Sequence, residues 1–451
     1  MVKRSRKILC LVMVIVLMSL LFAGCGSGSK GENTEQPSAS GSDAGKTDTS
    51  GQEKADGGGK KVTLSFWNGF TGPDGEILKD IVKRFNEKNA DKIEVKMDVM
   101  GWDVLSQKLP PAIATKAAPG MVLMIGDWIP QYLANDSFAV LDDFWQKTGL
   151  KEGDYVQNVL DIGKYNGKYY ALPMQFNLIY LYWNKDLFKA AGLDPEKPPQ
   201  TMEELGDYAV KLTDAKNNQF GFGMPVKGAP QYWTSFFWNN GGEIFDLKAK
   251  KSLLNSPENI KTLEWMQDLA VNKKVTPRGA GGADVDNLLM SGKLAMYING
   301  PWLINGLKGN KINFGITAPP KGSSRQQVIS GGIGYAVPST AKPEEKEAAY
   351  EFIKFWLSPE ILKEWSMKNG FPAWSSTVMN DADIKADPIQ SSISPLSSMG
   401  RAYNPEAYQN IGALDNDALW PMMEAIVAGS SKPADAIKKA SDKMDEIFKG
   451  N

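Results

Sequence analysis

The pattern of apolar and polar residues changes abruptly at residue 61. Residues 26–60 contain no Val, Leu, Ile, Phe, Tyr or Trp and are dominated by Gly, Ser, Ala, Asp, Glu and Lys. Such a segment buries too little apolar surface to order itself, and we therefore predict a disordered linker there. From residue 61 onward apolar residues recur with regular periods, which predicts that the folded part of the chain begins at that point.

Residues 61–125 alternate between strand-like and helix-like periods. Apolar residues recur at every second position in the first kind of stretch and at every third or fourth position in the second. The predicted elements are, in order, a strand at 62–66, a helix after 73, a strand at 93–99, a helix at 103–116 and a strand at 121–125. This order predicts an α/β fold in which helices cover a parallel sheet.

The N-terminus carries an apolar run too short to span a membrane, and its setting predicts export of the protein. Four basic residues precede the run from Ile8 to Phe22, whose 15 residues are fewer than the roughly 20 that a membrane-spanning helix needs. Together with the small residues before Cys25, this predicts a signal peptide over 1–25. The stretch resembles the bacterial lipoprotein signal, with Phe22 where that signal usually has Leu. The resemblance implies lipidation of Cys25; an ordinary secreted protein and an uncleaved anchor are the alternatives.

Composition excludes several kinds of functional site. The chain has no His, and its two cysteines, Cys10 and Cys25, both lie in the predicted signal. The exported chain therefore has no Ser-His-Asp triad, no Cys-His dyad and no His-ligated zinc, and we expect neither a metal nor a cofactor. Removing the signal lowers the net charge by four, from −1 to −5. Because no basic block follows the signal, we expect no nucleic-acid partner.

The thirteen tryptophans occupy two kinds of position. Trp265, Trp356 and Trp365 lie in helical patterns and are expected in the core. Five others lie beside Gly, Pro, Asn or Asp at the ends of strand-like runs, where ligands bind in open parallel sheets. These five candidate binding residues, whose alternative role is to cap the core, are Trp67, Trp128, Trp233, Trp302 and Trp374.

Three later segments resemble one protein family. Residues 169–193 read YYALPMQFNLIYLYWNKDLFKAAGL, residues 292–302 read GKLAMYINGPW, and residues 314–316 (FGI) are followed by SGG at 330–332. Together they resemble the extracellular solute-binding proteins of ABC importers, in the sugar-binding group typified by the maltose binder. The resemblance implies a two-lobed periplasmic-binding-protein fold (type II), each lobe a mostly parallel sheet flanked by helices, with the ligand cleft between the lobes.

The resemblance also implies how the chain divides. Lobe 1 would combine residues 61–174 with 331–372, and lobe 2 would combine 175–330 with 373–451, the first crossing lying near Pro173. Ligand would close the hinge between the lobes, which it can do only through contacts that differ between the open and closed states.

Candidate site residues are carried over from the resemblance one by one. Asp127 and Trp128 match a segment in which an acidic residue and a tryptophan contact sugar, and Asn177 stands where the family has a sugar-contacting glutamate. Trp233 matches a segment that supplies a stacking ring, and paired glycines suit a hinge or a close approach of backbone to ligand. The complete set is Trp67, Asn68, Asp127, Trp128, Asn177, Trp233, Trp302, Gly331, Gly332 and Trp374.

These observations predict a solute-binding lipoprotein of an ABC importer, without catalytic activity, that captures a mono- or oligosaccharide. Aromatic rings would cover the sugar faces while Asp and Asn groups bind the hydroxyls. We expect a monomer, anchored through Cys25 to the outer face of the membrane of a Gram-positive-type cell, that delivers its sugar to permease subunits. Two alternatives stay open: a binder of a glycerol-phosphate ester, polyamine or metal, the last through Tyr169 and Tyr170, and a secreted carboxylate hydrolase.

Overall fold

The computed structural model describes residues 61–133, 135–226, 231–404 and 408–450. The predicted signal peptide, the lipidation site at Cys25 and the linker at 26–60 lie outside the described residues. None of the helices in the described part of the chain combines the length and the apolar character that crossing a membrane requires.

The first of the two large sheets has six strands, four of them from the N-terminal part of the folded chain and two from later in the sequence. Its strands lie in the order β14–β13–β3–β1–β2, with β6 also paired to β13. The bounds are β1 Val62–Asn68, β2 Ile93–Val99, β3 Met121–Ile125, β6 Ala171–Leu178, β13 Val328–Ala336 and β14 Gly400–Ala402. β1 runs parallel to both β2 and β3, and the helices α2 (Pro73–Lys88) and α3 (Trp102–Ala114) connect these strands. The strand–helix–strand–helix–strand order predicted for 62–125 is confirmed.

The second large sheet has four strands, all from the middle of the chain, in the order β12–β7–β11–β8. The bounds are β7 Tyr180–Asn184, β8 Phe220–Gly223, β11 Leu294–Asn299 and β12 Phe314–Thr317. β7 is antiparallel to both β11 and β12, while β11 and β8 are parallel. The expectation of a mostly parallel sheet in each lobe is therefore corrected here. β7 pairs with neither β6 nor β8, its neighbours in sequence, and the strands that flank it, β11 and β12, run in the opposite direction.

The chain passes from the first sheet to the second within one residue. β6 pairs with β13 as far as Leu178, and β7 begins at Tyr180, so the crossing falls at Ile179. Pro173, near which the sequence places the crossing, lies inside β6. β13 brings the chain back to the first sheet. The exact lobe boundaries stay a prediction.

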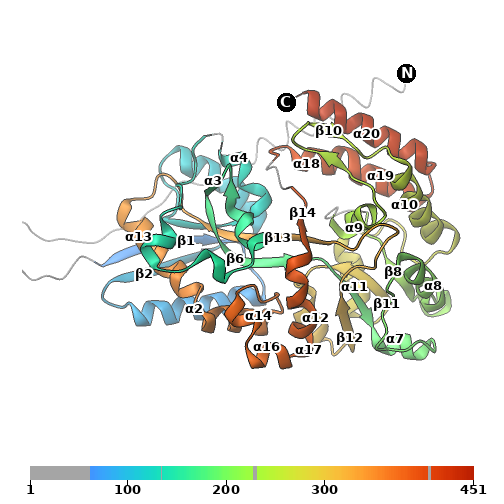
Figure 1. Cartoon of the computed structure of the whole chain (residues 1–451), viewed down its shortest axis with the longest axis horizontal. Helices are drawn as coiled ribbons and strands as arrows, with labels where there is room; N and C mark the ends of the chain where they lie inside the picture. Colours follow the sequence, from blue (N-terminus) through green and yellow to red (C-terminus); the bar gives the residue numbers. More distant parts are fainter. Residues whose placement is uncertain (1–60, 134, 227–230, 405–407, 451) are drawn as a thin grey trace, which may run out of the picture. The chain divides into compact units, whose positions relative to one another are not determined.

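Two large apolar cores lie on opposite faces of the second sheet. Tyr180 and Tyr182 of β7 belong to the first core, which also contains Trp356 and Trp365, whereas Leu181 and Trp183 belong to the second core. This alternation follows from the period of two in a strand. Helices α10, α19 and α20 gather on the second core (Figure 1).

The remaining longer helices surround the two sheets (Figure 1). Those between β7 and β12 are α7 Lys185–Ala190, α8 Met202–Leu212, α9 Gln231–Asn239, α10 Pro257–Gln267, α11 Gly282–Met290 and α12 Leu303–Gly309. Those that follow β13 include α13 Pro343–Trp356, α14 Pro359–Asn369, α19 Trp420–Ala428 and α20 Pro433–Lys449.

Candidate functional site

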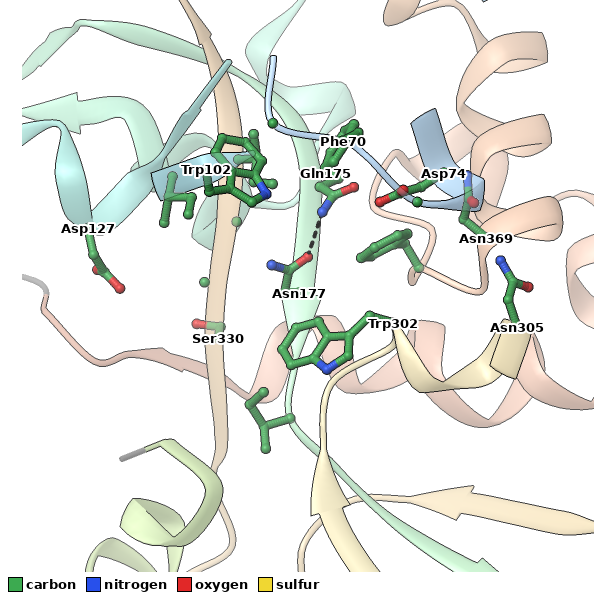
Figure 2. Close-up of a pocket in the computed structure, with 18 of the residues that line it drawn as sticks. Phe70, Asp74, Trp102, Asp127, Gln175, Asn177, Trp302, Asn305, Ser330 and Asn369 are labelled. Atoms are coloured by element: carbon green, nitrogen blue, oxygen red, sulfur yellow. Dashed lines mark hydrogen bonds between the residues drawn. The ribbon is translucent and has the colours of Figure 1, made fainter. Parts of the chain in front are cut away.

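A cavity of about 730 Å³ lies where β6 and β13 connect the two sheets (Figure 2). We call it the main cavity. Its walls come from the loops at strand ends in both sheets, from the crossing strands, and from the end of α14. Loops at the carboxyl ends of strands are the usual place for ligands in α/β proteins. Its lining includes the side chains of Phe70, Asp74, Trp102, Asp127, Gln175, Asn177, Trp302, Asn369 and Tyr403.

Trp302 presents its ring to the main cavity. It directly precedes α12, and 44% of its surface is exposed, which makes it the one exposed tryptophan in the described part of the chain. A Cβ on Gly300 would overlap the indole, so the ring folds back over a glycine. The Tyr182 hydroxyl donates to the Gly300 carbonyl oxygen at 2.7 Å. This bond holds the end of β11 and thereby positions the ring.

Trp102 forms a second aromatic wall. Its ring lies over Gly69, where an added Cβ would overlap it. It also makes edge-to-face contacts with Phe70, at 5.7 Å between ring centroids, and with Trp128, at 5.9 Å. Aromatic pairs prefer this arrangement. Two indoles, from the loops after β2 and β11, therefore border the same cavity.

Buried carboxamides supply the polar part of the wall. Gln175 donates from Nε2 to Asn177 Oδ1 at 3.2 Å, and the Asn177 nitrogen points away from Gln175 in Figure 2. Gln175 Oε1 and both polar side-chain atoms of Asn369 have no hydrogen-bond partner among the described residues. Asn369 and Gln175 are only 2% and 3% exposed. Buried polar atoms are normally hydrogen-bonded, so three unpartnered atoms on residues that line one cavity are unusual.

The charged groups at the main cavity are acidic. Asp127 follows β3 in the short helix η1 (Gly126–Trp128); it is open to the cavity, yet the surrounding protein desolvates it and raises its pKa to about 6. Beyond it, the Tyr403 hydroxyl donates to Asp415 at 2.5 Å. The pKa of Asp415 is raised to about 7, mainly by burial. The hydrogen bond from Tyr403 lowers this pKa, and the negative charge of Asp127 raises it further. None of the described lining residues is Lys or Arg.

Comparison with known protein families decides what kind of protein carries this cavity. A family model described as bacterial extracellular solute-binding protein matches residues 80–390. The chain belongs to this family. Solute-binding proteins of this kind act outside the cytoplasm.

Three relatives illustrate the range of this solute-binding protein's family. A putative binding protein of Brucella abortus is 25% identical over 407 residues, covering 88% of this chain and 94% of its own. The maltotriose-binding protein of Pyrococcus abyssi is 26% identical over 293 residues (63% and 61%). The sn-glycerol-3-phosphate-binding periplasmic protein of Escherichia coli K12 is 28% identical over 332 residues (69% and 74%).

Solved structures support the same assignment. A solute-binding protein from Thermotoga lettingae bound with α-D-tagatose has a TM-score of 0.74 and 25% identity, covering 86% of this chain and 99% of that chain. One from Agrobacterium radiobacter K84 in complex with ribitol has a TM-score of 0.72 and 29% identity, again covering 86% and 99%. These matches confirm the predicted two-lobed periplasmic-binding-protein fold.

The solute-binding protein brings half of its predicted site residues to the main cavity. Among the ten, those that line it are Asp127, Asn177, Trp302, Gly331 and Gly332. Trp67 and Trp128 are partly buried and pack on a smaller core cluster. Asn68 is fully buried, and its side chain accepts from the Phe70 N–H at 3.1 Å, so it shapes the loop after β1 instead of lining the cavity.

Trp233 and Trp374 lie in the cores of the solute-binding protein. Trp233, 1% exposed, packs against Phe237 and Trp420. Trp374, 3% exposed, packs against Tyr155. For these two, the geometry favours the alternative role that the sequence left open, that of a core residue.

Sequence reasoning did not include Trp102, Gln175 or Asn369. Trp102 follows the carboxyl end of β2, so the rule that selected Trp67 would also have selected it. Gln175 lies two residues before Asn177 in the same strand, and the period of two places both on one face. Asn369 ends α14, and no local pattern connects that helix end to the cavity.

Proposed function

We propose that this chain captures a carbohydrate for an ABC importer and catalyses no reaction. The observation that carries the proposal is the combination of an exposed Trp302 ring with the unpartnered polar atoms of Gln175 and Asn369 on the wall of one cavity. A sugar has apolar C–H faces and a rim of hydroxyls, so it can cover the ring and bond the carboxamides at once. Maltotriose, tagatose and ribitol, named for relatives above, are all polyhydroxyl solutes.

We further propose that the protein works as a hinge. The lobes would be 61–174 with 331–372 and 175–330 with 373–451, joined by β6–β7 and by β13. Closure would bring Trp302 on the second lobe toward Trp102 on the first with the sugar between them. The permease subunits of the importer would recognise the closed form, and a ligand shifts this equilibrium only by its difference in affinity for the two forms.

Attachment to the cell completes the proposal. Lipidation of Cys25 would anchor the protein to the outer face of the membrane, because a diacylglyceryl group supplies the two chains that stable anchoring needs. A flexible linker over the 35 residues of 26–60 would span roughly 30–35 Å root-mean-square. We propose a monomer that stays near its permease in this way in a Gram-positive-type cell.

A thermal-unfolding screen of the full chain tests the carbohydrate proposal. The probes are glucose, mannose, tagatose, ribitol, maltose, maltotriose and mannotriose, each at millimolar concentration. A ligand that binds only the folded state raises the melting temperature, and we expect at least one sugar to do so. Isothermal titration then gives the affinity. Failure of every probe to raise the melting temperature contradicts the proposal.

A phosphate ester is the second candidate solute, because one relative binds sn-glycerol 3-phosphate. The charges at the cavity oppose it. Asp74 and Asp127 line the main cavity, and none of its described lining residues is Lys or Arg. Asp74 also accepts the Gly75 N–H at 2.9 Å, so a carboxylate already bonds one N–H at the start of α2. Since like charges repel at close range, we expect sn-glycerol 3-phosphate to give no shift in the same screen.

Two candidate functions remain, binding of a metal ion and hydrolysis of a sugar by carboxylates, and the geometry favours neither. Tyr169 is 2% exposed and its hydroxyl donates to Glu152 at 3.1 Å, away from the main cavity. No group of three or more acidic residues in the described part of the chain is arranged to hold a metal ion. Hydrolysis of a bound sugar by the full chain, lost on replacing Asp127 by Asn, would overturn the non-catalytic proposal.

A further inference from the structure

The first sheet has a gap beside the main cavity. β13 pairs with β6 along one edge, from Ser330 to Ala336. Ser330 pairs at the same time with Ala402 of β14, so β14 lies on the opposite edge, where β3 pairs with Ile333–Ala336. Between β14 and β3, Gly331 and Gly332 have no strand partner on that edge among the described strands. On this stretch Gly126 and the Ile162 side chain lie against Gly332.

A second cavity, of about 330 Å³, lies at this gap. It shares four residues with the main cavity, namely Asp127, Ser330, Gly331 and Gly332. The rest of its wall includes two charged residues, Asp161 and Lys164. The Lys164 ammonium lies 4.7 Å from the centre of the Tyr169 ring. The two cavities therefore meet at the unpaired glycines, with Asp127 on the wall of both.

The two glycines differ in what surrounds them. A Cβ on Gly332 would overlap Ile162 and the Gln175 carbonyl, so packing alone requires glycine there. A Cβ on Gly331 would meet no atom within 4 Å, and its backbone is not in the left-handed region. Neither packing nor backbone conformation explains a glycine at 331. Gly331 pairs with Asn177, so the open space above it adjoins the carboxamide that lines the main cavity.

We propose that the solute is an oligosaccharide that occupies both cavities. One sugar unit lies against Trp302 and Asn177, and the next lies over Gly331 at the gap, within reach of Asp127 and Lys164. The absence of a side chain at 331 lets the sugar ring approach the backbone. This inference rests on the proposed function and narrows its solute from a sugar of any length to one of at least two units.

The test compares sugar length in the full chain and in two variants. Glucose, maltose and maltotriose form one titration series, and mannose, mannobiose and mannotriose the other. In at least one series the disaccharide should bind about tenfold more tightly than its monosaccharide. Gly331→Val adds a side chain above the strand, where a Cβ meets no atom within 4 Å, and should abolish this gain. Lys164→Met, which keeps the apolar stem, should weaken the longer sugars and leave the monosaccharide unchanged.

Gly153→Val is the matched control. Gly153 also has no atom within 4 Å of an added Cβ and an ordinary backbone, but it lines neither cavity. It should leave every affinity unchanged. Monosaccharide binding as tight as that of every longer sugar, or equal weakening of all lengths by both variants, overturns the inference while the proposed function stands. Absence of binding throughout both series overturns the inference, and the proposed function falls with it only if tagatose and ribitol also fail to bind. Lys164→Met keeps the test decisive if Gly331→Val does not fold.

Discussion

The end of β11 and the helix α9 each carry a tryptophan beside small or polar residues, yet they place it in opposite environments. After β11, Gly300 leaves room for the Trp302 indole to fold back over the backbone, and the ring remains 44% exposed at the main cavity. In α9, Trp233 lies on the face that packs against Trp420 and is 1% exposed. Neighbouring glycines and asparagines alone therefore do not identify a binding tryptophan; the element that carries it also matters.

Truncation of the buried tryptophan should have the largest effect. Trp233→Ala removes a fully packed indole from the second core and should lower the free energy of unfolding by about 3–5 kcal/mol. Urea unfolding measures this loss. Where the variant still folds, its sugar affinity should equal that of the parent protein. A stable variant with lost affinity would instead place Trp233 at the site.

Truncation of the exposed tryptophan should have the reverse profile. Trp302→Ala should weaken sugar binding roughly tenfold to a hundredfold. Its free energy of unfolding should stay within about 0.5 kcal/mol of the parent, since the side chain is exposed. Titration calorimetry and urea unfolding on the same preparation check both numbers. Trp302→Tyr, which keeps a ring, should retain most of the affinity; unchanged affinity in Trp302→Ala contradicts the stacking role.

The glycine under the ring offers a milder change. Gly300→Ala puts a methyl group where the Trp302 indole lies, so the ring must tilt. We expect sugar affinity to fall by about threefold to tenfold, from a strain of about 1 kcal/mol. Gly309→Ala is the matched control at the end of α12, because a Cβ there meets no atom within 4 Å. Equal affinities in the two variants would show that the ring does not depend on Gly300.

The smallest expected effect is a dependence of stability on pH. Desolvation raises the pKa of Asp127 from 3.8 to about 6, so between these values the folded state binds more protons than the unfolded state. Stability from this group therefore falls as pH rises through that window. Asp127→Asn removes this desolvated charge, and its melting temperature should exceed that of the parent at pH 7.5 and match it near pH 4. A difference of opposite sign contradicts the proposed environment of Asp127.

Local patterns in the sequence predicted the elements of 62–125 because each is set by its own hydrophobic period. They also placed Asp127 and Trp302 correctly at strand ends, whose position relative to a sheet follows from strand order. The antiparallel pairing of β7 was missed, because its partners β11 and β12 come much later in the chain and a local hydrophobic period does not record strand direction. Asn369 was missed for a related reason: it reaches the main cavity only through the packing of α14, which joins residues distant in the sequence.

The exposure of Trp302 gives the protein an optical signal of its own. Trp302 is the one exposed indole among the thirteen, so it should dominate the long-wavelength edge of the emission spectrum and the fraction quenched by acrylamide. A solute that covers the ring would remove water from that single fluorophore and shift the emission toward the blue. Binding of the solute could then be followed in real time without a label. Loss of the emission shift in Trp302→Tyr would assign the signal to this residue.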